Sequence, residues 1–302
     1  MPGRTPGHPN TISLKTDPGG ACRDLFYYSR TLGPLQAADT QSTGILYTIN
    51  DDIFPVIYYK YNFSVVNIYD NIYYILKRKE APCMVYSNSR KLMLSGWLKN
   101  NYPIAYDTPL KFQKFLLLYE SFSKIYGDKC DFSSLRGYKR GPVFSNVWGD
   151  YTKERSAFDK SADREYGRSS DKINEERAEK SAFIVNTLTE NELSDLTHSM
   201  NLWNNKKDRI LSGERQVTLD EEDFNQHDID MMQKLYDMFS IDEIRNSKII
   251  STDKHYFILN KSDYAKLTEQ QMDTLFTLSN SDTELNNPVY VEIDEDGRLL
   301  ID

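Results

Sequence analysis

Hydrophobic positions follow a helical period through most of the middle of the chain. The clearest case is the segment Leu110–Tyr126, in which large apolar residues recur three or four positions apart. These residues are Phe112, Phe115, Leu116, Tyr119, Phe122 and Tyr126. Thr108 and Pro109 suit the start of this helix, and Gly127 suits its end. Because further leucines widen its apolar face, the pattern predicts the central helix of a bundle.

Capping signals predict helices on both sides of this one. Ser87 or Asn88 suits the start of a helix that runs to Leu98. Thr189 and Glu192 have the spacing of a capping box, in which each side chain bonds to the backbone N–H of the other residue. These signals place helices in the segments that precede and follow the central helix.

Two more helices are predicted from apolar spacing and from proline. Residues 224–239 contain six large apolar residues at helical spacing. Pro142 follows Gly141 and suits the first turn of a helix, where a missing N–H costs nothing. We therefore expect a helix that begins at Pro142 and carries Val143, Val147 and Tyr151.

The two ends of the chain differ from this helical middle. Residues 1–44 are rich in proline and glycine, so we expect little order there. Residues 45–83 comprise a β-prone run followed by a linker. Residues 241–302 predict strands, a helix and a hairpin with Asp296-Gly297 as its turn. The predicted class is mainly α with short β elements (α+β): a helical core over residues 85–240 and a small α+β C-terminal appendage.

The composition is that of a globular protein, with 39% hydrophobic and 27% charged residues in a chain of 302. No run of about 18 apolar residues occurs, and the first residues lack the apolar core of a signal peptide. Three widely spaced cysteines fit a reducing compartment. We therefore expect a cytoplasmic protein with no membrane partner.

Charge is distributed unevenly along the chain. Residues 214–302 carry 8 basic and 21 acidic groups, whereas residues 85–213 carry 21 basic and 17 acidic groups. An acidic segment repels nucleic acid, so we do not expect nucleic acid as a partner. The acidic segment is either an ordinary solvated surface or a patch that docks a basic partner.

Sequence motifs of catalysis and cofactor binding do not occur. The chain has no GxSxG, GxxxxGK[ST] or GxGxxG, and its His and Cys residues lack the spacing of metal ligands. His198 is the best titratable candidate, with an ordinary histidine at a helix end as the alternative. We therefore predict that the protein is not an enzyme and holds neither a metal nor a cofactor.

Basic and aromatic residues are interleaved in the segment GYKRGPVFSNVW. The candidate partner-binding residues are Tyr138, Lys139, Arg140, Phe144 and Trp148. Such a mixture can grip nucleic acid through phosphate contacts and stacking, or can form the hot spot of a protein interface. The acidic balance elsewhere favours a protein partner, with this segment as an outward-facing surface.

Three segments, in this order, resemble motifs of the Panacea domain, also called the SocA-like antitoxin domain. They are LKFQKFLLLY from Leu110, GPV from Gly141 with the following VWGDY, and LSDLTHSMNLW from Leu193. The resemblance covers roughly residues 85–240. It departs from the family at Lys139-Arg140, and at Leu202, where the family has proline.

The resemblance implies a mostly helical antitoxin that binds a cognate toxin, encoded next door, or that delivers the toxin to a cytosolic protease. The motif residues carried over from the family are Leu110, Gln113, Lys114, Gly141, Pro142, Thr197, His198 and Trp203. The alternative function is a DNA-binding regulator or a phage-encoded anti-defence factor.

Overall fold

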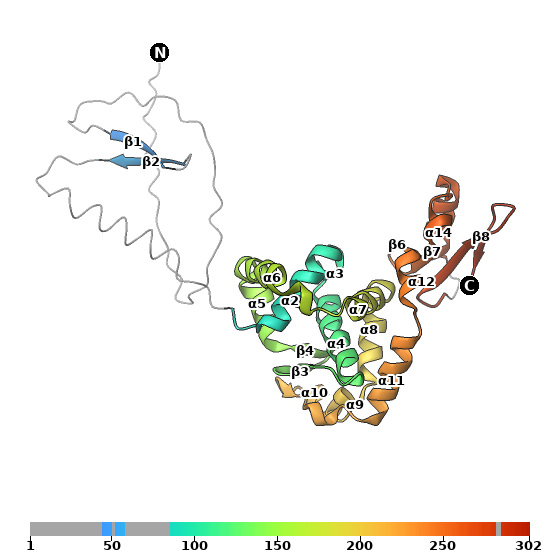
Figure 1. Ribbon diagram of the computed structural model, residues 1–302, viewed down its shortest axis with the longest axis horizontal. Coiled ribbons are helices and arrows are strands. Elements are labelled where there is room, and N and C mark those ends of the chain that lie inside the picture. Colours follow the sequence, from blue (N-terminus) through green and yellow to red (C-terminus); the bar gives the residue numbers. More distant parts are fainter. Residues whose placement is uncertain (1–43, 50–51, 58–84, 282–284) are drawn as a thin grey trace, which may run out of the picture. The chain divides into compact units, whose positions relative to one another are not determined.

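Helices form most of the described chain, and the predicted class, mainly α with short β elements, is confirmed (Figure 1). The computed structural model describes residues 44–49, 52–57, 85–281 and 285–302. The chain divides into two units, Met1–Leu76 and Lys77–Asp302. The predictions for residues 1–44 and for the linker before residue 85 lie outside the described residues, with the exception of Gly44.

The described residues of the first unit form an antiparallel strand pair. Strand β1 (Gly44–Ile49) pairs with β2 (Asp52–Ile57), with Gly44 opposite Ile57 and Ile49 opposite Asp52. Both strands lie at the start of the β-prone run predicted in residues 45–83, so the preference for strands is confirmed for this part of the run.

The second unit is built around helix α4 (Pro109–Ile125), as predicted. All of its residues from Lys111 to Ser123 are buried. In Figure 1, α4 lies between strands β3 and β4 on one side and helices α7 and α8 on the other. The chain leaves the helix through Gly127, whose φ of +68° is a conformation that glycine adopts without strain.

Helices α2 and α8 begin where the capping signals place them. Asn88 accepts a hydrogen bond from the Lys91 N–H at the start of α2, and Thr189 and Glu192 form both bonds of a capping box at the start of α8. The helices are α2 (Ser89–Asn101), α3 (Pro103–Asp107), α5 (Ser145–Lys153), α6 (Arg155–Ser169), α7 (Glu175–Thr187), α8 (Glu190–His198), α9 (Asn201–Asn204), α10 (Lys207–Leu211), α11 (Gln226–Asp237) and α12 (Ile241–Asn246).

A β-hairpin replaces the start of the helix predicted at Pro142, and that prediction is wrong. Strand β3 (Leu135–Tyr138) pairs with β4 (Gly141–Phe144) and with β5 (Val217–Thr218), in the order β4-β3-β5. Strand β4 lies at the edge of this sheet, so the missing N–H of Pro142 breaks no ladder bond. Helix α5 begins only at Ser145 and buries Val147 and Tyr151.

The C-terminal segment forms a four-stranded sheet with its own hydrophobic core. Strands β6 (Ser247–Ser251), β7 (Tyr256–Asn260), β8 (Val289–Ile293) and β9 (Leu299–Ile301) follow this order in the sheet, and only β7 and β8 are parallel. One face packs on α14 (Glu269–Asn280) through Leu275, while Ile258 belongs to the larger helical core. The short helix α13 (Lys261–Tyr264) follows β7, and the predicted turn has φ +78° at Gly297.

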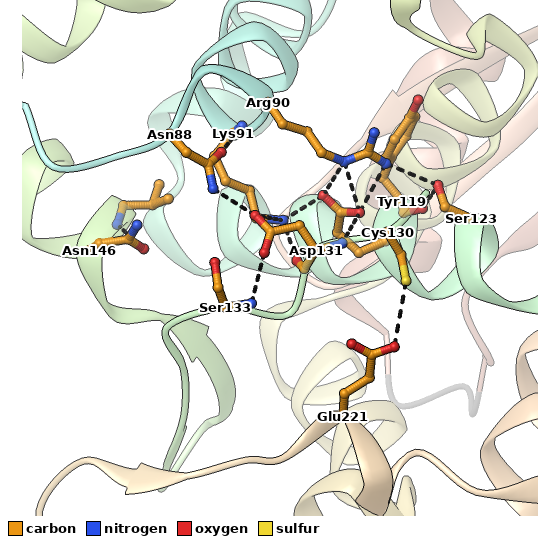
Figure 2. A network of polar contacts seen from close by, with 12 residues as sticks. Asn88, Arg90, Lys91, Tyr119, Ser123, Cys130, Asp131, Ser133, Asn146 and Glu221 are labelled. Carbon is orange, nitrogen blue, oxygen red and sulfur yellow. Dashed lines mark hydrogen bonds and ion pairs between the residues drawn. The ribbon is translucent and has the colours of Figure 1, made fainter. Parts of the chain in front are cut away.

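A buried ion network joins α2, α4 and the loop before β3. The Glu120 side chain is 0% exposed and accepts three bonds from the Arg90 guanidinium, one from Lys91 Nζ and one from the Asp131 N–H. Figure 2 shows Arg90, Lys91 and Asp131 of this network. Lys91 Nζ also lies 4.1 Å from the ring centroid of Phe144, so the network extends to the hairpin.

The first prediction concerns Glu120. The substitution Glu120→Gln leaves the buried Lys91 and the partly buried Arg90 without their shared carboxylate, so it should lower the free energy of unfolding by about 3–5 kcal/mol in urea denaturation. Glu221→Gln, which removes an exposed partner of Lys124, should cost less than about 1 kcal/mol. Equal losses in the two variants would contradict a central role for the buried network.

Candidate functional site

A small cavity of about 220 Å³ lies beside the β3–β4 hairpin; we call it the hairpin pocket. Its apolar walls are Pro109, Leu110, Pro142, Val143 and Trp148. Its polar lining residues are Gln113, Lys114, Arg140 and Glu190. The pocket is thus formed by the first two turns of α4, by strand β4 and by the starts of α5 and α8.

Lys114 brings a buried positive charge to the pocket. Its side chain is almost completely buried, and Nζ lies 3.4 Å from the carbonyl oxygen of Pro142. Burial, and then the nearby positive charge of Arg140, lower the pKa of Lys114 to about 7. No acidic group is among the causes of this shift, so the charge lacks the carboxylate partner that buried lysines usually have.

Gln113 contributes a second donor. Its Oε1 accepts a hydrogen bond of 2.9 Å from the Phe144 N–H, which fixes the orientation of the amide. The Nε2 group is buried and has no hydrogen-bond partner among the described residues. An unpaired buried donor costs roughly 1–3 kcal/mol, so the pocket holds a donor whose partner would stabilise the protein.

Arg140 and Glu190 form an ion pair among the lining residues. Arg140 Nη2 lies 2.8 Å from Glu190 Oε2, and the two side chains are 57% and 39% exposed. Trp148 is half-buried beside them. Because Glu190 already neutralises Arg140, the uncompensated positive charge of the pocket is that of Lys114.

The three motif segments meet behind the pocket. Gly141 has a φ of +98°, and a Cβ at this position would overlap with Lys114 Nζ and Thr197 Oγ1. Thr197 is fully buried on α8, where its hydroxyl donates to the Leu193 carbonyl. Close contact of α4, β4 and α8 therefore requires a residue without a side chain at position 141.

His198 and Trp203 support the hairpin from the other side. Their rings stack with centroids 4.0 Å apart, and Trp203 Nε1 donates a bond of 3.0 Å to the Tyr138 carbonyl. Burial and the charge of Lys114 lower the pKa of His198. His198 ends α8, as its alternative interpretation proposed, but its Nε2 has no partner among the described residues.

The structure brings together only part of the predicted partner-binding surface. Arg140 and Trp148 line the pocket, together with the motif residues Leu110, Gln113, Lys114 and Pro142. Lys139 is exposed and Tyr138 half-buried, and neither lines the pocket.

The prediction that Phe144 faces a partner is wrong. Its side chain is 0% exposed, because it lies opposite Leu135 on the inner face of the hairpin and under Lys91. Alternation along strand β4 therefore turns this ring into the core. Phe144 contributes to the pocket through its backbone N–H, which orients Gln113.

Sequence reasoning missed several residues of the site. Pro109 was noted only as part of a helix start and Val143 only as part of a helix, and Glu190 was overlooked. The sequence did carry one signal for Lys114, since it lies in a helix that is apolar on most sides. The partner of Arg140 was not foreseeable, because Glu190 is distant along the chain.

Comparison with known protein families, curated proteins and solved structures finds no match to this chain. The resemblance to the Panacea domain rests on the three sequence segments and stays a prediction. None of the helices in the described ranges is both long and apolar enough to cross a membrane. In the same ranges, no three His, Cys, Asp or Glu side chains are grouped to hold a metal ion.

Gly141 offers a test of the close contact behind the pocket. Gly141→Ala forces a strained φ, which costs about 1–3 kcal/mol, and adds an overlap with Lys114 and Thr197. We expect a clear loss of stability in thermal unfolding. Gly149→Ala is the control, because a Cβ there meets nothing within 4 Å and alanine favours the helix by up to about 1 kcal/mol. Equal stability of both variants would contradict the close contact.

Lys114 offers a test of the buried charge. Because folding lowers its pKa from 10.5 to about 7, the unfolded chain binds more protons between these pH values, and stability rises with pH across this window. Lys114→Met removes the charge. It should raise the free energy of unfolding by about 1–4 kcal/mol below pH 7, with a gain that shrinks towards pH 10.5.

The exposed residue Lys207 provides the control for this measurement. Lys207→Met should change the free energy of unfolding by less than about 0.5 kcal/mol at each pH. A stability gain of Lys114→Met that does not vary with pH would contradict a buried, titrating ammonium group.

Proposed function

We propose that this chain is an antitoxin-type protein that neutralises a toxin by direct binding at the hairpin pocket. The observation that carries the proposal is the convergence of the motif residues with Arg140 and Trp148 around one pocket. Leu110, Gln113 and Lys114 come from one motif segment, and Pro142 comes from another. Two of the three segments that suggested an antitoxin thus contribute to a single candidate binding surface.

The chemistry of this surface suits a protein partner. Tryptophan and arginine are the residue types most enriched at the energetic centres of protein interfaces, and half-buried side chains lose little freedom on binding. A volume of about 220 Å³ is below the usual range of sites for drug-sized ligands. It suits one anchoring side chain of a partner, surrounded by exposed residues such as Lys139.

The alternative of a DNA-binding regulator has less support. Arg140, the exposed basic residue among those that line the pocket, is paired with Glu190, which weakens its attraction for a phosphate. The net charge of −8 also opposes binding to nucleic acid. Delivery of the toxin to a cytosolic protease would follow the same binding step and is compatible with the proposal.

Co-expression with the neighbouring genes tests this function. We expect one neighbour to arrest growth when induced alone, and this chain to restore growth when expressed with it. Trp148→Ala should reduce rescue strongly, because truncation of a central aromatic residue typically costs at least about 2 kcal/mol of binding, or a factor of about 30 in affinity. The absence of toxicity and rescue for every neighbour would refute the proposed function.

Two arginines provide a matched control for the contact surface. Arg140 and Arg209 are 57% and 54% exposed, and each pairs with one glutamate. Arg140→Ala should weaken rescue, whereas Arg209→Ala should rescue as well as the original chain. Equal effects of the two variants would place the toxin elsewhere on the surface.

A further inference from the structure

The hairpin pocket contains a positive charge that no acidic group of the described chain neutralises. The other buried lysines have such partners: Lys91 bonds to Glu120, and Lys180 lies 3.3 Å from Glu176. Lys111 donates to the Tyr256 hydroxyl, and Glu190 and Glu192 act on its charge. Among the described residues, Lys114 has only the Pro142 carbonyl as a hydrogen-bond partner, at 3.4 Å. Keeping this charge inside the protein is costly unless an anion completes the site.

The amide of Gln113 provides the second half of such a site. Its Nε2 is buried, unpaired and held in place, because Oε1 is bonded to the Phe144 N–H. Gln113 and Lys114 both line the pocket, whereas its walls are apolar. An ammonium group and an unpaired amide N–H thus belong to residues that line one pocket, with apolar residues around them.

We infer that the hairpin pocket binds the carboxylate of an aspartate or glutamate side chain of the partner protein, an inference that rests on the proposed function. One carboxylate oxygen accepts from Lys114 Nζ and the other from Gln113 Nε2. The methylene groups of the guest pack on Leu110, Val143 and Trp148. The partner thereby supplies the counter-ion that the described part of the chain lacks.

A carboxylate fits this pocket better than a phosphate. A carboxylate has one charge and two oxygens, which match one cation and one amide donor. A phosphate group needs more donors, and Arg140 is already paired with Glu190. The limited volume and the apolar walls also favour a short side chain over a nucleotide.

Two small probes test the preference for a carboxylate on the full chain. N-acetyl-glutamate amide and N-acetyl-glutamine amide differ only in the charged group. Binding can be followed by the NMR signals of Lys114 Hε/Cε and of the Trp148 indole. We expect the glutamate probe to bind about tenfold or more tightly, since hydrogen bonds to charged groups are the stronger ones. Equal binding of the two probes would overturn the inference.

Three variants locate the binding. Lys114→Met should abolish the preference for the glutamate probe, as should Gln113→Glu, which keeps the acceptor for the Phe144 N–H but places a carboxylate in the pocket. Lys111→Met removes another buried lysine of the same helix, outside this pocket, and should keep the preference. Retained preference in Lys114→Met, with its fold confirmed by circular dichroism, would also overturn the inference.

The partner itself provides the final test, once a neighbouring toxin has been found. Substitution of one Asp or Glu of the toxin by Asn or Gln should weaken binding as much as Lys114→Met does. The two substitutions together should weaken binding no more than either one alone. If rescue occurs but no acidic residue couples to Lys114, the carboxylate inference fails and the proposed function stands. If the glutamate probe binds but no neighbour is neutralised, the proposed function fails, and with it the assignment of the carboxylate to a toxin.

Discussion

The neutralisation of the buried Glu120 carboxylate is the constraint on which the site depends. Two cations from α2 and a backbone N–H from the loop before β3 converge on this group, because a buried charge is tolerated only when it is paired and hydrogen-bonded. The network therefore fixes α2 and this loop against α4. Lys91 also lies over Phe144, so the same network contacts strand β4, which forms one wall of the hairpin pocket.

Lys114 presents the opposite case on the same helix. It is as deeply buried as Glu120, yet the described chain offers it no carboxylate, and the neighbouring Gln113 amide lacks an acceptor. A stable fold alone would not favour either feature. Departures from stability of this kind are expected where a protein meets a ligand or a partner. The proposed role of the pocket thus rests on the Lys114 ammonium and the Gln113 amide, which lack a counter-ion and an acceptor among the described residues.

Local rules predicted much of the fold. The start of α8 follows from the capping box of Thr189 and Glu192, and the end of α4 from the left-handed conformation at Gly127. Such signals act within one helical turn and can be read without any tertiary contact. The same reasoning failed at Pro142, because proline suits an edge strand as well as a first helical turn. The choice there depended on pairing with β3.

The sequence by itself determined the helical class, the central position of α4 and the segments that hold the motif residues. Its interleaved basic and aromatic residues also indicated Arg140 and Trp148 as part of the candidate surface. Only the tertiary structure decided that Phe144 points into the core, that Glu190 pairs with Arg140, and that Lys114 has no counter-ion among the described residues. Periodicity and capping are properties of neighbouring residues, whereas burial and charge neutralisation depend on residues that are distant in the sequence and meet only when the chain folds.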